Sequence, residues 1–181
     1  MTDTVLSITE IENFFQASTT RMLGLDPNAP ANQKRVRVAW PSKGAPAWKH
    51  EENVVFLMIG YADDSITRQM DVSYDQADVD NANRTVSYTR VIHVSWTCYG
   101  PNSFNDADLI RSNLFLPKTK ADLAAVNLAL IIDVPMPMRT PELFASQWWD
   151  RTSFFARFNE KVIRQSEVPY LQSADVRIIE G

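Results

Sequence analysis

The chain has 181 residues, of which 45% are apolar and 22% charged, and its formal net charge is −4. This size suits a single domain with a full core, and we expect residues 1–181 to form one. The acidic balance argues against a nucleic-acid-binding surface, which needs a basic patch. An acidic wall would instead repel phosphate and let a DNA strand slide past.

Cysteine usage and hydropathy indicate the cellular compartment of the chain and whether it contacts a membrane. The one cysteine, Cys98, has no partner for an intrachain disulfide, which fits a protein made in a reducing compartment. The first residues, MTDTVLSITEIENFF, lack the basic and apolar regions of a signal peptide. The longest apolar run, around residues 123–132, is shorter than the ~20 residues that cross a bilayer. We therefore expect a soluble protein without membrane contact.

The first predicted element is a helix over residues 9–23. Ser7 and Glu10 have the spacing of a capping box, and apolar residues follow at helical intervals. Gly24 can adopt the left-handed conformation that ends a helix.

Two strands are predicted next. Residues 34–40 alternate between polar and apolar side chains, which indicates a short strand. Residues 41–52 form a loop with two prolines and Trp48. Residues 53–61 are almost wholly apolar, which predicts a central strand covered on both faces.

A long β-hairpin is predicted over residues 67–99. Its arms, residues 68–75 and 84–99, alternate in polarity, and residues 76–83 (QADVDNAN) form a polar tip. The apolar face of the second arm comprises Val86, Tyr88, Ile92, Val94, Trp96 and Cys98. At ~3.3 Å per residue the second arm spans roughly 50 Å, more than a small domain needs. We expect part of the hairpin to project or to pair with another chain.

Two helices are predicted after the hairpin. Asn102 or Ser103 can cap a helix that ends near residue 116 and buries one stripe, formed by Phe104, Ala107, Ile110 and Leu114. A shorter helix opens at residues 119–122 and carries Leu123.

The remaining residues predict further strands. Residues 128–133 can finish the shorter helix or form a strand, and we favour the strand. Pro135, Pro137 and Pro141 force an extended connection. Alternation predicts strands over residues 148–163, with Phe154, Ala156, Phe158 and Val162 on one face, and over residues 174–180. This order of elements predicts an α+β fold, a mostly antiparallel sheet with helices packed on it.

No catalytic or metal-binding pattern emerges from the sequence. His50 and His93 have no Cys or His partner at zinc-ligand spacing. The acidic hairpin tip lacks the glycine and terminal glutamate of a calcium loop, so a solvated turn is the simpler interpretation. Cys98 lies on an apolar face, which favours burial over reactivity. We expect no enzymatic activity, metal or cofactor.

Residues 146–158, SQWWDRTSFFARF, place an acid and a base beside aromatics. Neighbouring residues on a strand point to opposite faces, so Asp150 and Arg151 cannot share one acid–base site. Trp148 and Trp149 are separated in the same way, one facing the core and the other a second surface. Tryptophan and arginine are common at interface hot spots. The stretch therefore predicts a strand entry and an interface.

The ordered features resemble the tail terminator, or neck terminator, proteins of long-tailed bacteriophages, over most of the chain. The resemblance rests on ITEIENFFQ, the loop with Trp40-Pro41 and Pro46, the long hairpin ending in VSWTCYGPNSFNDADLIRSNLFL, then LAAVNLALI, Arg139, QWWDRTSFFARF and the final VRIIEG. Relatives often carry a glycine where this chain has Asn127, and asparagine tolerates the same left-handed geometry.

The resemblance implies a virion structural protein of the neck or tail, assembled in the host cytoplasm. Such proteins form a homohexameric ring that caps the tail tube, stops its polymerisation and joins the head connector or stopper protein. In contractile tails the ring also anchors the sheath. Genomic DNA passes through the ring without sequence-specific binding.

A head-to-tail ring needs two different complementary surfaces on one subunit, and the hairpin is our candidate for one. We expect some of its carboxylates to face the ring channel or a neighbour. The candidate interface residues are Asp71, Asp75, Asp78, Asp80, Arg84, Arg139, Trp148, Trp149, Asp150 and Arg151.

Two rival interpretations remain open. One is a head–tail stopper, tube or baseplate-associated subunit, since those proteins share small β-rich folds. The other is a small hydrolase or ligand-binding domain that uses Asp150, Arg151 and His93. That alternative requires a pocket in which these titratable groups meet.

Overall fold

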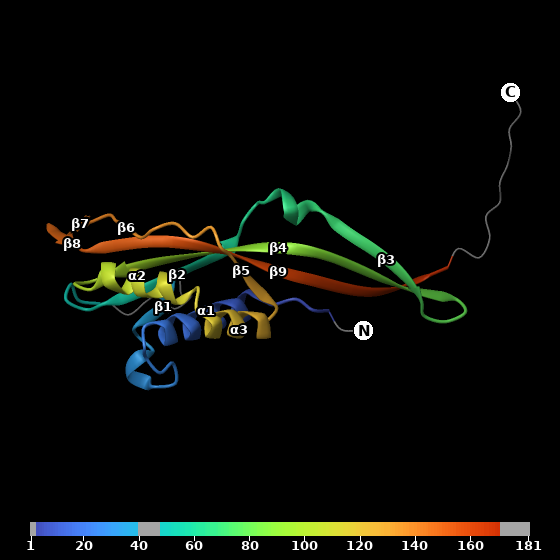
Figure 1. Cartoon of the computed structure of the whole chain (residues 1–181), viewed down its shortest axis with the longest axis horizontal. Helices are drawn as coiled ribbons and strands as arrows, with labels where there is room; N and C mark the ends of the chain where they lie inside the picture. Colours follow the sequence, from blue (N-terminus) through green and yellow to red (C-terminus); the bar gives the residue numbers. More distant parts are fainter. Residues whose placement is uncertain (1–2, 40–47, 171–181) are drawn as a thin grey trace, which may run out of the picture.

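The computed structural model describes residues 3–39 and 48–170. Helices lie against one face of a long, mostly antiparallel sheet, as expected for the α+β class (Figure 1). The α-helices are α1 (Ile8–Met22), α2 (Ser103–Asn113) and α3 (Pro117–Ala125), and short 3-10 turns lie at η1 (Pro30–Asn32) and η2 (Ser65–Arg68). No helix in these ranges is long and apolar enough to span a membrane.

The main sheet has the order β1-β2-β4-β9-β5, in which β1 and β2 are parallel and the other pairs antiparallel. Two further strands pair at its sides, β3 with β4 and β6 with β9, and β7 and β8 form a separate hairpin. The strand bounds are β1 (Val36–Val38), β2 (Val54–Tyr61), β3 (Met70–Gln76), β4 (Asn81–Tyr99), β5 (Leu128–Ile131), β6 (Met138–Arg139), β7 (Glu142–Phe144), β8 (Gln147–Trp149) and β9 (Arg151–Pro169).

The core forms where the helices cover the predicted apolar face of β4. Trp96 is fully buried, stacks on Phe154 at 4.9 Å between ring centroids, and donates its indole N–H to Thr19 Oγ1 at 2.9 Å. Phe15 of α1 packs against Phe158 of β9 at 4.7 Å. The predicted alternation of β4 and β9 is therefore confirmed, and burial of these large rings is the main stabilising contribution of the core.

The helix starts differ in detail from the prediction. The Ser7–Glu10 capping box and the left-handed Gly24 (φ +74°) are present at α1. In contrast, α3 begins at Pro117, two residues before the predicted start, because Thr119 donates its hydroxyl to Asn113 O in α2 and does not cap. In α2, the predicted apolar stripe is wrong at Phe104, which is 45% exposed.

Two strand predictions also need correction. Residues 53–61 do form a strand, but Met58 is 50% exposed because no helix of the described residues covers the second sheet face there. The predicted strand over residues 148–163 is interrupted at Asp150, and β9 then runs on to Pro169. The predicted strand over residues 174–180 lies outside the described residues.

The long hairpin carries a third strand that was not predicted. The first half of β4 pairs on one side with all of β3 and on the other with the last part of β9, from Glu160 to Pro169. These three segments form an arm that extends past the helices (Figure 1). We call the strands Met70–Gln76, 81–90 and 160–169 the arm.

A buried ion pair marks the point where the arm leaves the core. Glu160 is fully buried and accepts hydrogen bonds from Arg90, at 2.9 Å from Nε, and from the backbone N–H of Leu6, at 2.8 Å. Arg90 also donates to Leu6 O and to the Tyr61 hydroxyl, and lies over the Tyr61 ring. The segment before α1 is thereby fastened to the base of the arm.

Candidate functional site

The two adjacent tryptophans of β8 have different environments, as their alternation predicts. Trp148 is 67% exposed. Trp149 packs edge-to-face with Trp48, at 5.9 Å between ring centroids, and with Phe144, at 6.1 Å. Trp149 therefore belongs to an aromatic cluster beyond the main core, whereas Trp148 is available to a second molecule.

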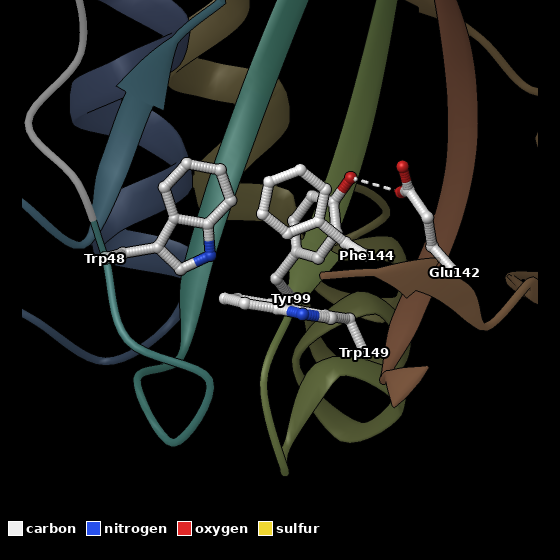
Figure 2. Close-up of a pocket in the computed structure, with 5 residues that line it drawn as sticks. All are labelled: Trp48, Tyr99, Glu142, Phe144 and Trp149. Carbon is white, nitrogen blue, oxygen red and sulfur yellow. Dashed lines mark hydrogen bonds between the residues drawn. The ribbon is translucent and has the colours of Figure 1, made fainter. Parts of the chain in front are cut away.

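The cluster encloses a pocket of about 370 Å³ at the end of the sheet opposite the arm tip. We call it the aromatic pocket, and its lining residues are Trp48, Tyr99, Glu142, Phe144 and Trp149 (Figure 2). They come from the segment before β2, the end of β4, and the β7–β8 hairpin. The lining is mostly aromatic, and the size lies near the lower end of the ~300–1,000 Å³ typical of ligand sites.

One acid stands among the aromatic walls of the pocket. The Tyr99 hydroxyl donates to Glu142 Oε2 at 2.9 Å, and Arg151 Nη1 lies 3.4 Å from the same oxygen. Burial raises the pKa of the Tyr99 phenol, and its hydrogen bond to Glu142 raises that pKa further. The Glu142 carboxylate is therefore already engaged by a donor and a cation of its own chain.

A tight turn positions Phe144 and Trp149. Ala145 and Ser146 link β7 to β8 with φ angles of +49° and +62°. A two-residue loop with both φ angles positive is the type I′ hairpin turn, which favours Asn-Gly. An alanine and a serine there carry a conformational cost, which the surrounding contacts must offset.

Asp150 and Arg151 bind different partners within the chain. Asp150 Oδ1 lies 2.8 Å from Arg139 Nη2, and Arg151 pairs with Glu142. The acid and the base are separated as expected, although Asp150 lies between β8 and β9 and not within a strand. Their contacts fasten β6 and β7 to the start of β9.

The hydrolase alternative required Asp150, Arg151 and His93 to converge, and they do not. His93 pairs in the sheet with Arg157, six residues along β9 from Arg151, or roughly 20 Å at strand spacing. His93 stacks on Phe155, and burial together with Arg157 lowers the pKa of its ring. Cys98 is buried too, which raises the pKa of its thiol to about 12.

The predicted acidic residues of the hairpin occupy two parts of the arm. Asp71 and Asp75 pair with Ser87 and Asn83, so they share one face of the arm. At the tip, Asp78 accepts hydrogen bonds from the backbone N–H groups of Asp80 and Asn81. These bonds lower the pKa of the Asp78 carboxyl, and they show that Asp78 holds the turn.

The other arm face carries exposed apolar side chains from β3 beside two arginines. Met70, Val72 and Tyr74 are 60%, 46% and 61% exposed, and they pair with Tyr88, Val86 and Arg84 of β4. This face continues the helix-covered face of the sheet beyond the helices, because β4 alternates without interruption. A groove of about 510 Å³ crosses it, with Arg84 and Arg164 in its lining. Exposed apolar patches of this kind are common at the interaction sites of proteins.

The sequence predicts the hairpin of the arm but not the aromatic pocket. Its lining residues lie at positions 48, 99, 142, 144 and 149, and no local pattern connects them. The only signal was the surplus of tryptophans, which indicated a surface beyond the core.

Comparison with known proteins identifies a family for this chain. A search of curated proteins found no match. The family model described as phage neck terminator protein matches residues 9–181, nearly the whole sequence. The chain therefore belongs to the phage neck terminator protein family.

Proposed function

We propose that this phage neck protein forms a hexameric ring on the head-proximal end of the tail tube. The ring stops tube polymerisation and presents the surface that joins the head connector or stopper, and it anchors the sheath where the tail contracts. DNA passes through its centre. The observation that carries the proposal is the exposed apolar face of the arm, on a chain of a neck family.

The arm supplies one of the two surfaces that a head-to-tail ring requires. Met70, Val72 and Tyr74 have no covering element among the described residues, and their burial would contribute ~25 cal/mol for each Å² of apolar area removed from water. The aromatic pocket and Trp148 lie at the other end of the sheet. Two different surfaces at opposite ends suit heterologous contacts that close into a ring.

The acidic residues of the arm have a separate role in this proposal. Asp71 and Asp75 share the face opposite the apolar one, and Asp80 lies at the tip. Facing the channel, they would repel the phosphates of passing DNA. Replacing Asp71 and Asp75 by lysine is expected to leave ring formation intact and slow DNA passage; unchanged DNA ejection would remove this role.

The oligomeric state of paired variants tests the ring. Light scattering of the wild-type protein is expected to give six copies of the 20.6-kDa chain, about 124 kDa. Val72→Asp places a charge on the apolar arm face and is expected to give monomers. Ser73→Asp, on the next residue and the opposite face, is the matched control and should still form rings. Equal assembly of both variants would exclude the apolar face as the contact.

Loss of the gene product in infected cells distinguishes the terminator from its nearest rival. Without a terminator we expect over-long or headless tails. Without a head–tail stopper, filled heads would leak their DNA. Electron micrographs of the lysate separate these outcomes, and normal tails with leaking heads would favour the stopper.

A further inference from the structure

Two tryptophans that line the aromatic pocket, and two residues beside it, have buried polar atoms without a hydrogen-bond partner among the described residues. Six buried side-chain polar atoms have no hydrogen-bond partner in the described part of the chain, and four of them belong to this corner. They are Trp48 Nε1, Trp149 Nε1, Arg151 Nε and Thr140 Oγ1. Three of the four are N–H groups. A buried donor left unpaired costs about 1–3 kcal/mol, so such a cluster calls for a missing partner.

The side chains at this corner favour a ligand that accepts hydrogen bonds over a cationic ligand. Aromatic cages that hold cations present ring faces and a free carboxylate. Here Oε2 of Glu142 is already bound by Tyr99 and Arg151. In Figure 2 the indole nitrogen of Trp48 lies on the side of its ring that faces the other pocket residues. An N–H group aimed into a pocket repels a cation and attracts a carbonyl oxygen.

We propose that the aromatic pocket binds an extended, proline-containing segment of a neighbouring virion protein, whose carbonyl oxygens accept hydrogen bonds from Trp48 and Trp149. Proline matches the pocket because it supplies a carbonyl but no N–H of its own. Its flat apolar ring fits between aromatic side chains, and the extended conformation is already formed before binding. The inference rests on the proposed neck function only for the identity of the partner.

The geometry of the pocket allows such a segment to enter. Phe144 is 64% exposed, ends a strand at the two-residue turn and packs on Trp149, so binding requires this exposed ring to move away from the buried Trp149 indole. Trp48 and Trp149 stand nearly perpendicular, with 76° between their ring planes, and form two walls of a corner. Tyr99 packs against Trp48 at 5.7 Å between ring centroids and is held by Glu142.

Titration with two peptides tests the proposal. The probes are hexaproline and a Gly-Ser hexapeptide of equal length, and the readout is the indole N–H signals of the protein in two-dimensional NMR. We expect hexaproline to shift the Trp48 and Trp149 signals downfield, as hydrogen bonding does, while the Gly-Ser peptide leaves them unchanged. Equal shifts with both peptides, or none with hexaproline, would overturn the proposal, as would shifts caused by tetramethylammonium alone.

Conservative variants assign the binding to the indole nitrogens. Trp149→Phe keeps an aromatic wall but removes one donor, and we expect hexaproline affinity to fall about 2–10-fold, as for one hydrogen bond. Trp148→Phe, at the exposed neighbour, is the matched control and should bind like the wild type. Equal affinity of wild type and Trp149→Phe would contradict the assignment, provided that both unfold at the same urea concentration.

The same samples separate this inference from the ring. Mass measurement by light scattering reports assembly without peptide. If the protein forms rings but does not bind hexaproline, the pocket proposal is refuted and the ring proposal stands. Binding by a protein that stays monomeric would support the pocket and count against the hexamer.

Discussion

The ion pair at the base of the arm gives the sharpest stability prediction. Glu160 is 1% exposed at its side chain and Arg90 17%, so removing Arg90 leaves a buried carboxylate without its cation. Breaking a buried pair in this way costs about 3–5 kcal/mol. For a chain of this length each kcal/mol lowers the melting temperature by about 2–4 °C. We therefore expect Arg90→Met to melt roughly 6–20 °C below the wild type.

A double variant shows whether the uncompensated charge is the cause. Arg90→Met combined with Glu160→Met removes both charges, and replacing a buried ion pair by apolar residues is often close to neutral. The double variant also loses the hydrogen bonds to Leu6, at about 1 kcal/mol each. We expect it to be more stable than Arg90→Met alone, although it carries one more substitution.

Urea unfolding at one fixed protein concentration measures these differences, since assembly would change the apparent stability. The matched control is Arg68→Met, because Arg68 and Asp63 form an ion pair whose side chains are 70% and 78% exposed. Its loss should cost ~0–1 kcal/mol. A loss below about 1 kcal/mol for Arg90→Met, or a double variant less stable than the single one, would refute the reasoning.

Two further predictions concern the turn and the buried thiol. Replacing Ala145-Ser146 by Asn-Gly supplies the residues that both positive φ angles favour, so the free energy of unfolding should rise by roughly 1 kcal/mol in urea titrations; a decrease would mean that the turn is not strained. The pKa of the Cys98 thiol is raised from its usual range to about 12, so its contribution to stability is complete below pH ~9 and is lost as the pH rises towards 12. The unfolding free energy of Cys98→Ala should accordingly fall less steeply than that of the wild type above pH ~9, and parallel curves would contradict the stated pKa.

The sequence was informative wherever local alternation coincides with one buried face. Along β4 the apolar positions from Ile92 to Cys98 alternate without a break, and all point into the core. The same holds for Phe154 to Phe158 in β9. Asn127 adopts the left-handed conformation expected of it, with φ +60°. Period-two burial leaves a strong pattern, so these elements were predictable.

The pattern failed where polar residues serve structural roles. Arg90 and Glu160 occupy core-facing positions, where charged residues are not expected. They form an ion pair across two strands, and the sequence of either strand alone does not predict it. The end of β9, residues 164–169, is polar because it belongs to the arm, so nothing in its composition predicted a third strand. The turn at Ala145 and Ser146 lacks the Asn-Gly signal, which hid the β7–β8 hairpin.

The candidate interface was only partly predictable for a related reason. Adjacent-residue alternation correctly separated Trp148 from Trp149, but Trp149 packs in the pocket cluster and not in the predicted core. Asp150 and Arg151 also have different partners, although Asp150 lies between two strands. The partners that complete the pocket are distant in the chain, and only the fold brings Trp48 and Tyr99 to the same corner.

Imaging of the neck can reveal the proposed ring and its place in the virion. An electron-microscopy reconstruction of tails from infected cells should reveal six copies of this chain in one ring between the tube and the head connector, with each arm contacting an adjacent subunit. A reconstruction in which this position is occupied by another protein, or in which the chain is present with a different symmetry, would contradict the account.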